Sequence, residues 1–199
     1  MNELVRVIDC LNENQLKIVQ SHLKTIEWDV CTVFDSEGDS VLSEVRNGKR
    51  GFISDIHPVA NIMHEAFNRA LLVYAQENMK YCEAFANQFP TPGAWNTTSY
   101  RESIQFLKYD VGERYGYHVD MAPRRDTPEH HRTHSIVLYL NEEFEGGRTI
   151  FPHKAFKPKA GQALIFPSSW SYPHQCEEIS SGTKLAAVTW YYTIYGDSA

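Results

Sequence analysis

The chain has 199 residues, of which 42% are hydrophobic and 22% charged, and its formal net charge is −6. This composition is typical of a globular protein with a sizeable core, and without a clustered basic face the chain is not expected to bind nucleic acid. It has no segment like a signal peptide, no run near the roughly 20 apolar residues of a membrane span and no CxxC pair, so we expect a cytoplasmic protein without membrane partners.

Two segments of the N-terminal half have the periodicity of amphipathic helices. The first is expected from Glu13 to Trp28, with Asn12 as its N-cap and apolar residues three and four positions apart. The second is expected from Pro58 to Tyr74 or beyond, because proline suits the first turn of a helix and an apolar stripe comes after it. We expect both apolar stripes to pack on the core.

Two further segments have the composition of connections. Asp35–Arg50 is rich in Ser, Glu, Asp and Gly, which favours a loop or a loose hairpin. Residues 89–100 contain two prolines and a glycine and are expected to link the helical part of the chain to its C-terminal half.

From about Arg101 the pattern is typical of β-strands. Short strands rich in β-branched and aromatic residues are expected at Ser103–Tyr109, Ile136–Leu140, Gln162–Phe166 and Leu185–Tyr195. In the first of them, Leu107 and Tyr109 should share one face and Phe106 should lie on the other. Several short strands with Gly and Pro turns favour a sandwich or jelly roll, with the N-terminal helices packed against one sheet.

His118 and Asp120 form an HxD pair, and residues two apart in a strand point to the same face. Both can therefore reach one metal ion, and His174 is the best candidate for a third ligand. Two histidines and one carboxylate form the facial triad of non-haem iron(II) oxygenases. An HxD pair alone is weak evidence, so the residues around it decide.

Lys184 lies ten residues after His174 and two after the turn glycine Gly182. It opens the last expected strand, which brings an ammonium group back toward the metal ligands. A buried ammonium needs an anionic partner, because an unpaired charge in a dry pocket is costly. We therefore expect Lys184 to pair with the distal carboxylate of a bound molecule.

These features occur in a known order, and the chain resembles the prolyl 4-hydroxylase-like branch of the 2-oxoglutarate oxygenases over about Val41 to Trp190. The matching elements are Tyr109, Gly112 and the HxD pair, Arg132, Tyr139-Leu140-Asn141, Gly146-Gly147-Arg148-Thr149-Ile150-Phe151-Pro152, Pro158, Gly161, Phe166, His174, Gly182, Lys184 and Trp190. A chance match would not keep so many elements in order.

The resemblance implies a mainly β fold with N-terminal helices (α+β), a double-stranded β-helix or jelly roll. It implies one oxygenase domain over residues 1–199, with helical support and a substrate loop in residues 1–100 and the catalytic core in residues 101–199. Val45–Phe52 resembles the family's mobile substrate loop, and we expect Asp35–Arg50 to close over substrate.

The resemblance also implies cofactors and residue roles. The implied ligands of Fe2+ are His118, Asp120 and His174. The implied contacts of 2-oxoglutarate are Lys184, at the C5 carboxylate, and Tyr109, Tyr139 and Thr149. The implied substrate contacts are Arg132 and Trp190. The implied reaction uses O2, with L-ascorbate as a further candidate cofactor, to hydroxylate a prolyl residue of a peptide or protein while 2-oxoglutarate is decarboxylated to succinate.

Three alternatives stay open at this point. The same oxygenase chemistry could act on a non-prolyl substrate, because Met121–His131 and Ser168–Pro173 depart from the family pattern near the expected substrate entrance. A zinc hydrolase could use the same three ligands, but it needs no lysine for a dicarboxylic co-substrate. A non-catalytic jelly-roll binding module would be expected to have lost a ligand or the lysine.

Overall fold

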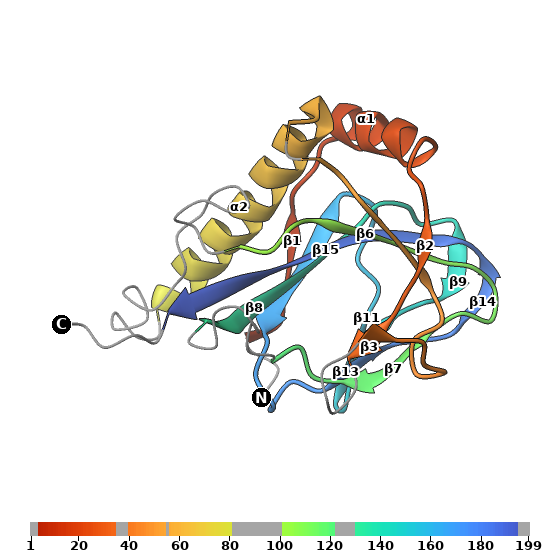
Figure 1. Cartoon of the computed structure of the whole chain (residues 1–199). Coiled ribbons are helices and arrows are strands. Elements are labelled where there is room, and N and C mark those ends of the chain that lie inside the picture. Colours follow the sequence, from red (N-terminus) through yellow and green to blue (C-terminus); the bar gives the residue numbers. More distant parts are fainter. Residues whose placement is uncertain (1–3, 35–39, 55, 81–100, 122–129, 195–199) are drawn as a thin grey trace.

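The computed structural model describes residues 4–34, 40–54, 56–80, 101–121 and 130–194, and two antiparallel sheets and two helices organise this part of the chain (Figure 1). The larger sheet has seven strands in the order β1 (Arg6–Asp9), β12 (Gln162–Pro167), β8 (His130–Tyr139), β15 (Lys184–Ile194), β6 (Gln105–Tyr109), β5 (Lys49–Phe52) and β2 (Asp29–Val30). The four-stranded sheet has the order β11 (Lys154–Phe156), β10 (Thr149–Phe151), β13 (His174–Cys176) and β7 (Tyr115–His118). Two short strand pairs complete the fold, β14 (Ile179–Gly182) with β9 (Phe144–Gly146) and β3 (Val33–Phe34) with β4 (Ser40–Val41).

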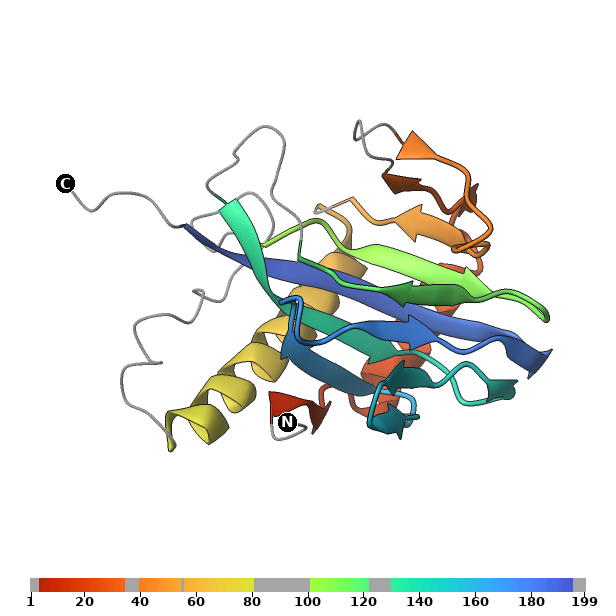
Figure 2. The same ribbon diagram turned by 90° about the horizontal axis from the view of Figure 1, so that it is seen from below.

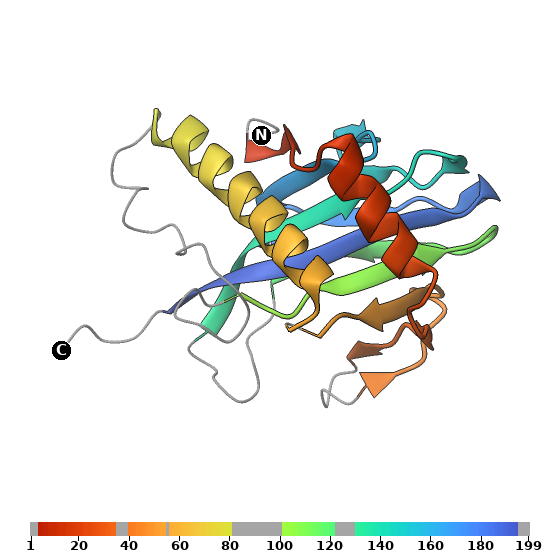
Figure 3. The ribbon, with the colours of Figure 1, turned by 90° about the horizontal axis from the view of Figure 1, so that it is seen from above.

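Both helices lie on one face of the seven-stranded sheet, and the four-stranded sheet lies on the other side (Figures 1 and 3). Figure 2 shows the face that carries the smaller sheet. This arrangement is the jelly roll with supporting N-terminal helices that the sequence predicted. Neither described helix combines the length and the hydropathy that crossing a membrane requires.

Helix α1 runs from Glu13 to Leu23 and starts as predicted, with a capping box in which the Gln15 N–H donates to Asn12 Oδ1 at 2.9 Å. It ends earlier than the predicted Trp28. Thr25 closes the last turn, because its N–H and its hydroxyl both donate to the carbonyl of His22, at 2.9 and 2.8 Å. Helix α2 runs from Pro58 to Met79, as predicted.

Alternation along the strands sorts side chains between two cores. Phe106 packs among the buried residues under the helices, while Leu107 and Tyr109 belong to a second cluster between the sheets. Because strand residues alternate between faces, β6 and β15 present every second side chain to the space between the sheets. The predicted alternation in this strand is confirmed, and it places Tyr109 on the inner face.

The expectation that Asp35–Arg50 is a loop or a loose hairpin is wrong at its C-terminal end. Lys49 and Arg50 belong to β5, which pairs with β6 and β2. Pairing with the strongly patterned β6 overrides the weak strand propensity of this stretch. Residues 35–39 lie outside the described residues, as do residues 89–100.

His134 on β8 packs edge-on against the Tyr74 ring of α2, with 5.5 Å between ring centroids. Burial lowers the pKa of His134 from its ordinary 6.5 to about 4. Between these two pKa values the unfolded chain binds more protons at His134 than the folded chain does. The contribution of neutral, buried His134 to the free energy of unfolding is therefore fully present above pH 6.5 and is lost as the pH falls toward 4.

We expect the free energy of unfolding to fall by up to about 3 kcal/mol over this window on account of His134 alone. Urea unfolding of the parental protein and His134→Gln, each at several pH values between 7 and 4, measures it. The variant should show a flatter pH dependence, and equal slopes for the two proteins would contradict the assignment.

Candidate active site

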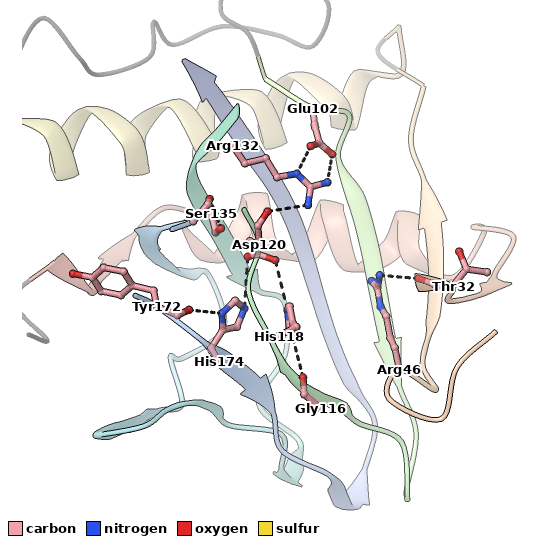
Figure 4. Close-up of polar contacts among 11 residues, drawn as sticks. Thr32, Arg46, Glu102, Gly116, His118, Asp120, Arg132, Ser135, Tyr172 and His174 are labelled. Carbon is pink, nitrogen blue, oxygen red and sulfur yellow. Dashed lines mark hydrogen bonds and ion pairs between the residues drawn. The ribbon is translucent and has the colours of Figure 1, made fainter. Parts of the chain in front are cut away.

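The three predicted metal ligands converge at the four-stranded sheet. His118 ends β7 and His174 begins β13, and the antiparallel register places the two residues directly opposite each other. Asp120 comes two residues after His118, and its Oδ1 and Oδ2 lie 3.5 Å from His118 Nε2 and 3.6 Å from His174 Nε2 (Figure 4). All three ligand atoms lie within 4.8 Å of one another.

Backbone carbonyls fix both imidazole rings. The Nδ1 of His118 lies 2.8 Å from the carbonyl oxygen of Gly116, and the Nδ1 of His174 lies 3.1 Å from that of Tyr172. Such contacts favour a proton on Nδ1 and leave Nε2 free to bind a metal. The ring of Tyr115 stacks on His118 at 3.6 Å between centroids and an interplanar angle of 11°, which further restricts the ring.

The protonation states suit metal binding. Burial alone would raise the pKa of Asp120, but the imidazoles of His174 and His118 and the guanidinium of Arg132 lower it well below its usual range. Burial lowers the pKa of His174. An ionised carboxylate beside a neutral imidazole is the form that a divalent cation binds.

The spacing of the donors also fits an iron centre. Adjacent ligands of an octahedral ion with bond lengths near 2.1 Å lie about 3 Å apart, slightly closer than the gaps of 3.5 and 3.6 Å between Asp120 and the two histidines. Two imidazoles and one carboxylate on one side of the ion leave neighbouring positions for other molecules. The residues present therefore fit a two-histidine, one-carboxylate metal centre.

A cavity of about 520 Å³ adjoins these ligands, and Lys184 lies in its wall. Lys184 is only 2% exposed, and its Nζ donates to the Gly147 carbonyl at 2.7 Å and to the Tyr139 hydroxyl at 3.4 Å. Burial acts to lower the pKa of Lys184, but Cys176 and Tyr139 outweigh it and the pKa is raised. A charged ammonium thus faces the same cavity as the metal ligands.

The other predicted co-substrate residues surround this ammonium. Tyr109 lines the cavity and lies directly opposite Lys184 in the pairing of β6 with β15. Thr149 lines it too, and its Oγ1 lies 2.8 Å from the hydroxyl of Tyr139, which stands behind Lys184. The structure therefore brings together all four residues, which the sequence places up to 75 positions apart.

Arg132 and Trp190 lie together in the cavity wall, with the guanidinium 3.9 Å from the centroid of the indole. Glu102 binds Arg132 with both carboxylate oxygens, at 2.5 Å from Nε and 2.9 Å from Nη2. The Nη1 of Arg132 donates to the backbone carbonyl of Asp120 at 3.4 Å (Figure 4). Arg132 thus connects the metal ligand to the wall that the resemblance assigned to substrate.

Sequence reasoning missed three residues of this site. Glu102 and Tyr115 carry no signal in the sequence. The partner of Glu102 is Arg132, which is distant in the sequence, and the role of Tyr115 depends on how its ring stacks on His118. Cys176 does carry a signal. It lies two residues after His174 and so points to the same face, and its Sγ lies 3.3 Å from Lys184 Nζ.

Gly48 packs against Tyr109, which ties the segment before β5 to the cavity. A Cβ at Gly48 would lie 2.5 Å from Tyr109 Cε1 and 3.1 Å from the Lys108 carbonyl oxygen. We expect Gly48→Ala to displace the Tyr109 ring and to raise the KM for 2-oxoglutarate by about tenfold. A displacement of about 1 Å in a group that positions a reactant can reduce the rate by tenfold or more. Steady-state kinetics test this, with the exposed Glu44→Ala as a control in the same segment. An unchanged KM in Gly48→Ala would show that Tyr109 does not contact the co-substrate.

Comparison with known proteins agrees with this geometry. Residues 104–192 match the model of the 2OG-Fe(II) oxygenase superfamily. A PKHD-type hydroxylase of Alteromonas mediterranea is 34% identical over 101 residues, which cover 46% of this chain and 44% of that protein. The chain thus spans less than half the length of the curated relatives it matches.

Solved structures share the fold over almost the whole chain. The viral collagen prolyl hydroxylase of Paramecium bursaria Chlorella virus-1 in its 2OG complex is 18% identical, with a TM-score of 0.62, and the match covers 96% of this chain and 97% of that one. A prolyl hydroxylase of Trichoplax adhaerens, in complex with a hypoxia inducible factor peptide fragment, is 17% identical with a TM-score of 0.62 and covers 95% of this chain and 83% of that one. Residues 104–192 thus resemble the 2OG-Fe(II) oxygenase superfamily in sequence, and the solved structures share the jelly-roll fold of the chain.

Proposed function

We propose that this chain is a 2-oxoglutarate- and Fe2+-dependent dioxygenase that hydroxylates prolyl residues in a peptide or protein. The observation that carries the proposal is the buried Lys184 ammonium in the same cavity as the His118, Asp120 and His174 side chains. A hydrolytic metal site has no use for such a group, whereas a dicarboxylic co-substrate bound to the metal needs one. We also propose that residues 1–199 form one domain.

Each residue has a definite task in this proposal. The triad residues hold Fe2+, and Lys184 pairs with the C5 carboxylate of 2-oxoglutarate. Tyr139 and Thr149 orient the ammonium and its carboxylate partner through the hydroxyl–hydroxyl contact of 2.8 Å, and Tyr109 contacts the same molecule. When bound, iron, 2-oxoglutarate and O2 supply the oxidising chemistry, which converts 2-oxoglutarate to succinate and CO2 and adds one oxygen atom to the substrate.

The protein itself positions the reactants and keeps the site dry. Asp120 and His174 are 7% and 5% exposed, so little water competes with the bound molecules at the ligands. Arg132 and Trp190 form the wall beside the metal and are proposed to position the substrate. L-Ascorbate is proposed as the reductant that maintains Fe2+. The prolyl substrate is supported by the family resemblance and by the two prolyl hydroxylases that share the fold.

The test is incubation of the purified chain with Fe2+, 2-oxoglutarate, O2 and a library of proline-containing peptides. We expect succinate release together with peptides that gain one oxygen atom, and loss of both when Zn2+ replaces Fe2+. Oxygen gain at a residue other than proline would keep the oxygenase and correct the substrate. Peptide cleavage that Zn2+ supports and that needs no 2-oxoglutarate would replace the proposal with a hydrolase.

A further inference from the structure

The cavity carries more positive charge than the proposed cofactors neutralise, a charge balance that rests on the proposed function. The charged side chains in its wall are Arg46, Arg50, Glu102, Asp120, Arg132 and Lys184. Fe2+ is balanced by Asp120 and the C1 carboxylate of 2-oxoglutarate, and Lys184 by the C5 carboxylate. Arg132 is paired with Glu102. Two arginines, in and just before β5, have no counter-charge in this balance.

Arg46 is held by protein groups. Its Nη1 donates to the Thr32 carbonyl at 3.4 Å, and its guanidinium lies 4.8 Å from the centroid of the Tyr115 ring. The side chain also contacts the Tyr109 hydroxyl, which favours the charged guanidinium. Arg46 therefore acts as a fixed part of the wall rather than as a free cation.

Arg50 is different. It lies in β5 opposite Leu107, so its side chain shares the inner face of the sheet with that of Leu107. Among the described residues the Arg50 side chain forms no ion pair and no hydrogen bond. Its Nε is buried without a partner, as is that of Arg46, but the rest of the Arg50 guanidinium also lacks one among these residues. Asp29 is its direct neighbour on β2, yet no ion pair joins them, and the guanidinium instead lies 5.8 Å from the Phe52 ring centroid.

Two other side chains of the same wall, on β6 and β15, have polar atoms that lack a hydrogen-bond partner in the described part of the chain. Gln105 Oε1 and Trp190 Nε1 are buried, line the same cavity and have no hydrogen-bond partner among the described residues. In the registers of β5, β6 and β15, Gln105 is the diagonal neighbour of Arg50, and Trp190 is the diagonal neighbour of Gln105. A line of two donors and one acceptor thus crosses three adjacent strands.

We infer that Arg50 forms a second anion subsite in this cavity and that the substrate carries a carboxylate beside the residue that is hydroxylated. A guanidinium binds a carboxylate through two parallel hydrogen bonds, a geometry that no neutral amide reproduces. Gln105 Oε1 and Trp190 Nε1 then accept from and donate to the adjoining peptide group. The carboxylate belongs either to an Asp or Glu side chain or to a chain terminus.

The physical reason for selectivity is the cost of an unpaired cation. A substrate with a carboxylate gives Arg50 its missing partner, whereas a neutral substrate covers the guanidinium and leaves it desolvated and unpaired. Sites with buried polar groups reject ligands that lack the matching group for this reason. A charge-assisted hydrogen bond of this kind corresponds to roughly tenfold or more in affinity.

Binding can be measured separately from turnover. The full chain with Fe2+ and 2-oxoglutarate, without O2, is titrated by calorimetry with N-acetylated pentapeptides of alanine around a central proline, which are C-terminally amidated in the first two sets. One set carries Asp or Glu at a single flanking position, a second carries Asn or Gln there, and a third is neutral inside but has a free C-terminal carboxylate. The first and third sets distinguish the two sources of the carboxylate.

We expect at least one carboxylate set to bind about tenfold or more tightly than the amide set. Arg50→Gln should remove this preference, Arg50→Lys should keep part of it, and Lys49→Gln should keep all of it, because Lys49 pairs instead with Asp110 at 2.6 Å. The affinity for the amide peptides is the internal control for folding. Equal affinities for acid and amide peptides, a preference that survives Arg50→Gln, or no binding of any carboxylate peptide would each overturn the inference.

Admission of O2 then tests the proposed function independently. A carboxylate preference in binding with no oxygen gain and no succinate would leave the subsite in place and refute the proposed activity. Oxygen gain by peptides that show no carboxylate preference in binding would support the proposed activity and refute the anion subsite at Arg50.

Discussion

Asp120→Ala is expected to abolish succinate release and to reduce the affinity for Fe2+ by at least tenfold. The carboxylate is the anionic member of the triad and contacts both imidazoles, at 3.5 and 3.6 Å. Without it, two neutral rings face a divalent cation, and changes to groups that only support the ligands already weaken metal binding about 10- to 100-fold. Titration with Fe2+ under anaerobic conditions and a succinate assay with O2 measure the two effects.

A shorter displacement should already damage turnover. Asp120→Glu keeps the charge but moves the carboxylate by about 1 Å, a shift that costs about 10²-fold in rate. The matched control is Asp9→Ala, on β1 at the far edge of the seven-stranded sheet, which should retain both iron affinity and turnover. If Asp120→Ala, folded by circular dichroism, released succinate at the parental rate, the triad assignment would be wrong.

The parts of the site that could be read from sequence are those that a local rule places. His118 and Asp120 are two residues apart in an extended segment, so their shared face results from the geometry of a strand. The same rule placed Tyr109 on the inner face of β6. The position of Lys184 is also predictable, because the turn glycine Gly182 precedes a strand of strong β-propensity. The chain is therefore expected to turn there and to return Lys184 toward the metal ligands.

The missed parts depend on pairings between distant segments. Glu102 binds Arg132, which lies 30 positions later in the sequence, and the residues flanking either one do not indicate this pairing. The sequence does not indicate β5, because Lys49, Arg50 and Gly51 have weak strand propensity on their own and become a strand by pairing with β6. The subsite inferred at Arg50 is a product of this pairing, so no local pattern could have indicated it.

The strand β5 also limits how Asp35–Arg50 can close over substrate. The last two residues of this segment are hydrogen-bonded to β6, and Gly48 is packed on Tyr109, so closure of the whole segment would disrupt the cavity wall. The backbone of Val45 and Asn47 is also hydrogen-bonded to Gly116 and Arg114, so we propose that any movement that admits substrate occurs before Val45. Limited proteolysis with and without a hydroxylatable peptide is the test of closure.

Lys184→Ala is expected to leave Fe2+ affinity unchanged and to raise the KM for 2-oxoglutarate by tenfold or more. An ammonium is not a metal ligand, so loss of Lys184 does not remove a donor to iron. Its charge-assisted pair with the C5 carboxylate contributes about 1.5–3 kcal/mol, which corresponds to roughly 10- to 150-fold in affinity. The carboxylate left without a partner in a buried pocket adds to the loss.

The contacts of the ammonium shape the controls. Lys184→Arg should give an intermediate KM for 2-oxoglutarate, because a guanidinium can still pair with a carboxylate but is longer and forked. Gly147, Tyr139 and Cys176 leave little room for it, since their contacts with Lys184 Nζ are 2.7 to 3.4 Å long. Lys108→Ala is the matched control, since Lys108 pairs with Leu185 on the adjacent strand and lies next to Tyr109 in β6, on the opposite face of the sheet. It should not change the KM.

Iron and 2-oxoglutarate titrations on the same Lys184→Ala preparation separate the two readings of this residue. An unchanged affinity for 2-oxoglutarate would remove Lys184 from the co-substrate site. Loss of iron binding together with a lower unfolding free energy would instead show that the contact with the Gly147 carbonyl supports the turn before Thr149, because a buried acceptor that loses its donor costs about 1–3 kcal/mol. Only a defect confined to 2-oxoglutarate distinguishes an oxygenase from other uses of the same three metal ligands.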